Sequence, residues 1–114
     1  MSIIDKTVST TDTTVTTIQE IDISTDKVLG LTVDITAIDQ NQQSAYFSQK
    51  TTFKNDNDIV TKIGSTKNVF RNREDTDWNV SYSISGTIVS INVAGEDGKE
   101  IDWTCRTYVI PEES

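Results

Sequence analysis

Histidine is absent from the 114-residue sequence, and cysteine, proline and methionine occur once each. Without histidine, a serine or cysteine nucleophile lacks its usual general base. The lone cysteine cannot form a disulfide within the chain, so the sequence implies no oxidising compartment. No flanking pattern singles out one carboxylate pair for acid–base hydrolysis. We therefore predict a protein that is not an enzyme and that needs no cofactor.

Long apolar segments and basic residues are also scarce. No stretch approaches the roughly 20 apolar residues that span a bilayer, and the first residues lack the basic and apolar regions of a signal peptide. The sequence contains ten Lys and Arg residues and 18 Asp and Glu residues, which gives a net charge of −8. This charge disfavours nucleic-acid phosphates and anionic membranes as ligands. We expect neither nucleic acid nor membrane among the partners.

Threonine and serine are abundant, and in many places they alternate with apolar residues. This alternation is clearest over residues 77–110, in three runs typical of strands with one buried face. Trp78, Tyr82 and Trp103 lie on the apolar sides of these runs, so we expect them in the core. Cys105 lies on the Trp103 side of its run, and we expect it to act as a small buried hydrophobe.

Alternation also predicts strands in the first two thirds of the chain. Residues 29–37 and 45–54 give the clearest patterns, and shorter strands are expected over 16–23 (with a bulge after Gln19), 59–63 and 69–70. No segment has the 3.6-residue period of a helix. The spacing predicts an all-β fold, an antiparallel β-sandwich or barrel of about 7–9 strands, and we favour the sandwich.

The first 17 residues differ from the remainder because they hold seven threonines and few large apolar side chains. Such a segment is either a disordered tail or an extended arm that adds a strand to a neighbouring subunit. We expect an extended N-terminal arm over residues 1–17 and a β-sandwich domain over residues 18–114. The apolar residues of the arm are its candidate partner contacts, namely Ile3, Ile4, Val8 and Val15.

Two acidic loops, residues 55–58 and 74–77, offer oxygen ligands that calcium prefers, yet neither matches the spacing of a calcium-binding loop. The alternative is a solvated turn in which Asn and Asp side chains cap the local backbone. The charged segment 71–77 contributes two further candidate contacts, Arg71 and Arg73. Tyr46 and Tyr108 fall on the polar sides of their strands and complete the set of candidate partner contacts.

From Tyr46 onward the chain resembles a small β-domain of structural proteins in tailed bacteriophages. A charged pair precedes a tryptophan, a glycine turn follows, and a closing strand contains tryptophan and arginine. The segments that carry the resemblance are Thr52-Phe53-Lys54, Val60-Thr61-Lys62-Ile63-Gly64-Ser65-Thr66, Asp75 through Trp78-Asn79-Val80, Ser85-Gly86, Val89 through Gly95, and Gly98 through Trp103 with Arg106.

The resemblance implies a virion structural protein that is made in the host bacterial cytoplasm. We expect an auxiliary or decoration protein that binds the capsid surface and bridges neighbouring subunits, with the major capsid protein or other virion proteins as partners and with many copies, or a homo-oligomer, in the assembly. A tail, neck or fibre-attachment component is the first alternative. A carbohydrate-binding module that uses exposed aromatic residues is the second.

Overall fold

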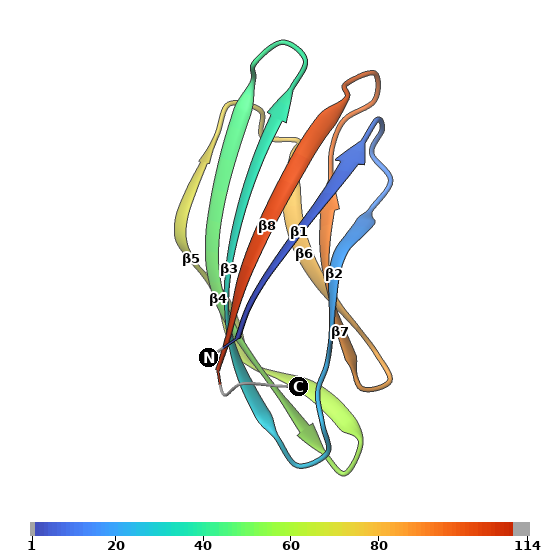
Figure 1. Cartoon of the computed structure of the whole chain (residues 1–114), viewed down its shortest axis with the longest axis vertical. Coiled ribbons are helices and arrows are strands. Elements are labelled where there is room, and N and C mark those ends of the chain that lie inside the picture. Colours follow the sequence, from blue (N-terminus) through green and yellow to red (C-terminus); the bar gives the residue numbers. More distant parts are fainter. Residues whose placement is uncertain (1, 111–114) are drawn as a thin grey trace.

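The computed structural model describes residues 2–110, which form an all-β sandwich (Figure 1). Two antiparallel sheets pack against each other, as the alternating pattern predicts. The strands of the described part are β1 (Ser2–Thr10), β2 (Thr16–Asp22), β3 (Val28–Asp39), β4 (Ser44–Asp56), β5 (Ile59–Arg73), β6 (Asn79–Ser85), β7 (Ile88–Ala94) and β8 (Ile101–Ile110). No helix within residues 2–110 is long and apolar enough to cross a membrane.

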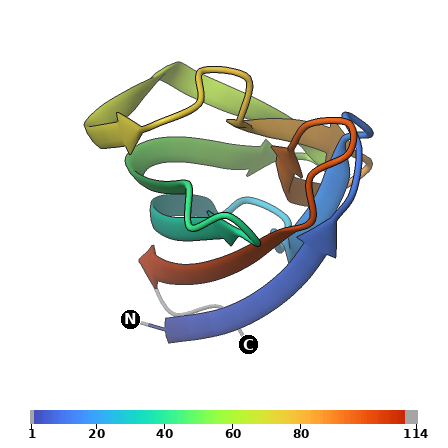
Figure 2. The ribbon, with the colours of Figure 1, turned by 90° about the horizontal axis from the view of Figure 1, so that it is seen from above.

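The larger sheet has the strand order β1-β8-β3-β4-β5, and the smaller sheet has the order β2-β7-β6. Seen from above, the five-stranded sheet curves beside the three-stranded sheet (Figure 2). The three runs of residues 77–110 are the strands β6, β7 and β8, yet they do not form one sheet. β8 crosses to the larger sheet and lies between β1 and β3.

The core lies between the two sheets and is built around the two tryptophans. Trp78 and Trp103 are fully buried, and their ring centroids lie 6.1 Å apart. The inward-facing residues of β3 extend this core along the larger sheet, since every second residue from Leu29 to Ala37 is buried. The predicted core tryptophans are therefore confirmed, and Cys105 is buried beside Trp103 as expected.

Strand β2 contains the predicted irregularity. Its register with β7 shifts between Thr17 and Gln19, and both Ile18 and Gln19 are buried as a result. A bulge of this kind places two successive side chains toward the interior, which strict alternation forbids. The bulge predicted for this strand is confirmed, although the shift lies just before Gln19 rather than after it.

β5 corrects the prediction of two short strands followed by a charged loop. It is one 15-residue strand, so Arg71 and Arg73 belong to a strand and not to a loop. Its register with β4 shifts twice, and Gly64 adopts a φ of 69°, which glycine tolerates without strain. Most of its side chains are exposed, including Phe70, and β5 is an edge strand of the larger sheet.

The N-terminal segment is extended, yet residues 2–10 do not project from the domain. They form β1, which pairs antiparallel with β8 along its whole length. Side-chain contacts reinforce the pairing: Trp103 Nε1 donates to Thr10 Oγ1 at 2.9 Å, and the Arg106 guanidinium forms two hydrogen bonds with the Asp5 carboxylate at 2.8 and 3.0 Å. We expected this segment to be a free arm or a disordered tail. The pairing with β8 shows that residues 2–10 are instead a strand of the sandwich.

Candidate functional site

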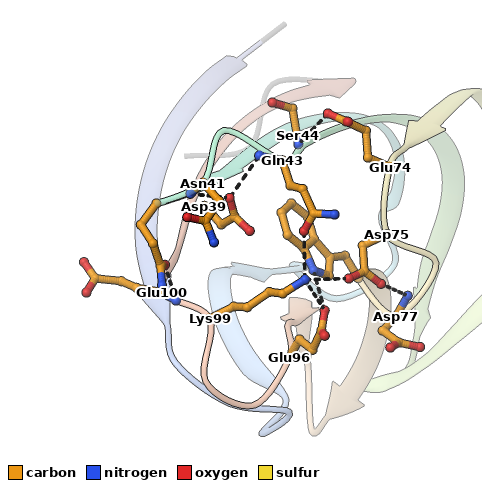
Figure 3. Close-up of polar contacts among 12 residues, drawn as sticks. Asp39, Asn41, Gln43, Ser44, Glu74, Asp75, Asp77, Glu96, Lys99 and Glu100 are labelled. Atoms are coloured by element: carbon orange, nitrogen blue, oxygen red, sulfur yellow. Dashed lines mark hydrogen bonds and ion pairs between the residues drawn. The ribbon is translucent and has the colours of Figure 1, made fainter.

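Four loops meet at one end of the sandwich, and a single ammonium group joins three of them (Figure 3). Lys99 Nζ lies 2.8 Å from Gln43 Oε1, 3.1 Å from Asp75 Oδ2 and 3.2 Å from Glu96 Oε1. Nearby, the Glu100 backbone N–H donates to Gln40 Oε1 at 2.9 Å. Lys99 therefore holds the β3–β4, β5–β6 and β7–β8 loops in one arrangement.

The charges of this cluster shift the titration of its members. Hydrogen bonding with the Glu96 carboxyl group, the Asp77 backbone N–H and the Lys99 ammonium, in that order of effect, lowers the pKa of Asp75 to about 2. The hydrogen bond to Asp75 and the proximity of Glu96 raise the pKa of Lys99. Both groups are therefore charged at neutral pH, and each stabilises the charged form of the other.

Carboxylate oxygens of Asp75, Asp77 and Glu96 lie within 4.8 Å of one another, which is close enough for shared metal ligation. The Lys99 ammonium already forms ion pairs with two of these carboxylates, those of Asp75 and Glu96. The Asp77 backbone N–H donates to Asp75 Oδ1 at 2.9 Å, which is the local capping contact of an Asx-turn. The arrangement thus explains the acidic loop by internal pairing and capping.

The second acidic loop lies at the opposite end of the sandwich (Figure 1). Asn57 and Asp58 both have positive φ values, 54° and 66°, as a tight two-residue hairpin turn between β4 and β5 requires. Asp58 accepts a hydrogen bond from the Thr25 hydroxyl group. This loop is therefore a hairpin turn, and its Asp58 side chain links it to the β2–β3 loop.

A cleft opens between the two sheets on the side of β5 and β6. At the opposite edge of the sandwich, β1 of the larger sheet and β2 of the smaller sheet contact each other. The cleft has a volume of about 430 Å³, and its wall includes residues of β4, β5 and β6. Tyr82 lines the cleft and packs against the buried Phe53, with ring centroids 6.2 Å apart.

Polar side chains in this cleft form a hydrogen-bonded chain. The Tyr82 hydroxyl donates to Gln49 Oε1 at 2.8 Å, and Gln49 Nε2 donates to Asn68 Oδ1 at 2.9 Å. Burial is the main cause that raises the pKa of Tyr82, so the phenol keeps its proton and remains a donor. These two hydrogen bonds fix the orientation of the Asn68 amide. The NH₂ group of Asn68 has no hydrogen-bond acceptor among residues 2–110.

Two cations, Lys62 and Arg71, also line the cleft. Neither has an acidic partner within the described part of the chain. They belong to a basic hairpin, β4–β5, which holds six of the ten Lys and Arg residues and two of the 18 Asp and Glu residues. Residues 44–73 therefore carry a net charge of +4 in a chain whose total is −8.

Three of the predicted partner contacts share the outer face of the five-stranded sheet. Ile3 lies opposite Tyr108 in the β1–β8 register, and both point away from the core. Tyr46 lies on the same face and contacts Phe70 in a tilted arrangement, with ring centroids 5.3 Å apart. Tyr46 and Phe70 are 38% and 48% exposed, which leaves an aromatic pair in contact with solvent.

The other predicted contacts lie apart from this face. Ile4 and Val8 point inward and pack against the core, whereas Val15 is exposed in the β1–β2 loop. Arg73 is half-buried, and its guanidinium donates to the Trp78 carbonyl oxygen at 2.9 Å and to Asn79 Oδ1 at 2.7 Å. Arg71 lines the cleft. The eight residues thus do not form one continuous surface.

Sequence reasoning did not find the cleft or the role of Lys99. Tyr82 was predicted as a core residue, and its ring does pack on Phe53, but its hydroxyl faces the polar chain. Gln49, Lys62 and Asn68 had no distinguishing pattern. The available signal was the clustering of positive charge over residues 44–73 in an acidic chain.

Comparison with known proteins gives structural matches alone, since neither a protein-family model nor a curated protein matches the sequence. The tailspike protein of Acinetobacter phage vB_ApiP_P1 matches 92% of this chain with a TM-score of 0.54 and 11% identity. The tailspike of Acinetobacter baumannii phage AM24 matches 98% of this chain with a TM-score of 0.49 and 10% identity. Tailspike gp49 of the Acinetobacter baumannii bacteriophage Fri1 matches 92% of this chain with a TM-score of 0.46 and 16% identity.

The match covers 21%, 27% and 17% of these three proteins, respectively, so this chain spans less than a third of each. At such low identity the vB_ApiP_P1 match shows a shared fold. The comparison also corrects one prediction. We predicted that the chain is not an enzyme, but gp49 of Fri1 is described as a capsular polysaccharide depolymerase, which is an enzyme.

Proposed function

We propose that this chain is a domain of a tail-associated protein in a bacteriophage virion. The observation that carries the proposal is the shared fold with the vB_ApiP_P1 tailspike over 92% of the chain. The resemblance of residues 46–106 to virion structural proteins, noted from sequence, supports the same class. On this proposal the partners are other tail proteins and further copies of the chain.

Among the virion placements considered from sequence, the tail is the one that the structural match favours. A capsid auxiliary protein was expected to reach neighbouring subunits through a projecting arm. Residues 2–10 instead pair with β8 of their own chain, so the feature that suggested capsid bridging is used within the domain. The domain is elongated, with extents of 46 × 24 × 23 Å, and a module of this shape fits end to end in a tail appendage.

Copy number in purified virions tests this proposal. Tail proteins follow the three-fold or six-fold symmetry of the tail, whereas proteins that coat the capsid occur on the order of hundreds of copies. Quantitative mass spectrometry of virions, calibrated with labelled peptides from this chain, is expected to give a small multiple of three or six. A value in the hundreds would contradict a tail position.

A further inference from the structure

The inter-sheet cleft has the composition of a ligand site, and nothing about the proposed virion placement explains it. Lys62 and Arg71 lie in the same cleft without acidic partners in the described part of the chain, although acidic residues outnumber basic ones in the sequence. Elsewhere in the domain, Lys99 and Arg106 are paired with carboxylates. Unpaired cations beside a cleft favour an anionic ligand.

The remaining lining groups define the ligand further. Hydroxyl and amide side chains, which both donate and accept hydrogen bonds, surround the cations, and they belong to Gln49, Thr66, Asn68, Ser81, Tyr82 and Ser83. Tyr82, whose ring packs against the buried Phe53, supplies an aromatic surface against which an apolar ring face can pack. A volume of about 430 Å³ lies within the usual range for small-molecule sites.

We propose that this cleft binds an acidic saccharide, with a ligand carboxylate held by Arg71 and a second positive contact provided by Lys62, whose partner on β4 lies six residues further along that strand than the partner of Arg71. The guanidinium group of Arg71 can form two parallel hydrogen bonds with a carboxylate, and the Lys62 ammonium adds a point charge. Sugar hydroxyl groups would pair with the Asn68 amide and the neighbouring serine and threonine hydroxyls. This proposal does not depend on where in the virion the domain is located.

An acidic peptide strand is the other anionic ligand to consider, and the structure disfavours it. A peptide would bind by adding a strand to the free edge of β5. The register of β5 shifts twice and Gly64 bends it, and such irregularities, together with edge lysines, are features that prevent strand addition. The polar groups of the cleft are side chains rather than a regular row of backbone groups.

Calorimetric titration of the full chain at low ionic strength tests the proposal. The probes are tetragalacturonate, a neutral tetrasaccharide of glucose, and a tetraglutamate peptide. The acidic sugar is expected to bind at least about tenfold more tightly than either of the others, because only it satisfies both the cations and the hydroxyl-binding groups. Equal binding of the neutral sugar, tighter binding of the peptide, or no binding of tetragalacturonate would overturn the proposal.

Matched variants locate the site. Arg71→Gln and Lys62→Gln each remove one positive charge from the cleft and are each expected to weaken tetragalacturonate binding about tenfold. Lys27→Gln removes the same charge from an exposed position in the β2–β3 loop, outside the cleft, and is expected to change the affinity less than about twofold. Equal losses in all three variants would show that net charge alone attracts the sugar, and the site assignment would be wrong.

Discussion

At the scale of single residues, the buried pair Gln19 and Thr107 is the clearest departure from an apolar interior. Thr107 Oγ1 donates to Gln19 Oε1 at 2.8 Å, and both residues are almost fully buried between the sheets. Gln19 Nε2 has no hydrogen-bond partner among the described residues. A polar group buried in this way destabilises the fold when its partner is lost, whereas removal of both partners is close to neutral.

We predict that Gln19→Leu alone lowers the free energy of unfolding by about 1–3 kcal/mol, because it leaves the Thr107 hydroxyl without its acceptor. The double variant Gln19→Leu with Thr107→Val is expected to recover most of that loss. Urea denaturation of the two single variants and the double variant measures both effects. A double variant as unstable as the sum of the two single variants would show that the pair is not coupled.

Cys105 gives a second prediction at this scale. Burial is the first cause that raises the pKa of its thiol, so the reactive thiolate is scarce in the folded protein. Native protein at pH 8 is expected to leave an aromatic disulfide reagent unreduced for hours, whereas protein unfolded in guanidinium reacts within minutes. Rapid reaction of the native protein would show that Cys105 is accessible.

At the scale of elements, a strand can be predicted from the sequence when one of its faces is buried and the other is exposed to solvent. β3 and β8 have one fully buried face, so their apolar residues alternate and the sequence predicts them. β5 has almost no buried side chain, so its apolar and polar residues do not alternate. For this reason the sequence predicts turns and short strands over residues 62–70 instead of one long strand. β1 appeared to be an arm because its partner, β8, lies more than 90 residues away in sequence.

β1 also changes what truncation should do. Removing residues 1–10 exposes the edge of β8, deletes the half-buried Ile4 and Val8, and leaves Trp103 Nε1 without Thr10. We predict that the free energy of unfolding falls by about 3 kcal/mol and that tryptophan fluorescence shifts to longer wavelength.

The substitution Ile3→Ser is the matched control for this truncation because Ile3 points outward and is 53% exposed. It should change the free energy of unfolding by less than about 0.5 kcal/mol. A truncated protein with the stability and fluorescence of the full chain would mean that β1 is a dispensable arm after all.

Lys99 gives an element-scale prediction with a pH dependence. Because the pKa of Asp75 is lowered to about 2, its ionic contribution is present above the usual carboxyl pKa near 4 and is lost as the pH falls toward 2. Lys99→Met should lower the urea midpoint at pH 7, and the difference from the unchanged protein should shrink between pH 4 and pH 2. Because the pKa of Lys99 is raised, the difference should also shrink at strongly alkaline pH.

Lys27→Met is the control for this experiment, since the Lys27 side chain is exposed and lies at the other end of the sandwich. Its urea midpoint should follow that of the unchanged protein at every pH. If Lys99→Met shows the same pH profile as this control, the ammonium group does not hold the three loops together.

At the scale of the whole molecule, the sequence predicts the sandwich class but not the cleft. The cleft residues are spread from Gln49 to Ile84 and come from strands of both sheets. Local alternation states which face of a strand is buried, but it does not state which strands of two sheets lie opposite each other. The charge of the β4–β5 hairpin was readable in the sequence, and only the fold shows that two of its cations face a cleft.

The central claim is that the domain belongs to the virion tail, and immunogold electron microscopy tests it directly. Antibodies raised against this chain would be applied to intact virions, with antibodies against the major capsid protein as the positional control. The account predicts gold particles at the tail and none above background over the capsid. Gold distributed over the capsid surface, in the pattern of the control antibody, would contradict it.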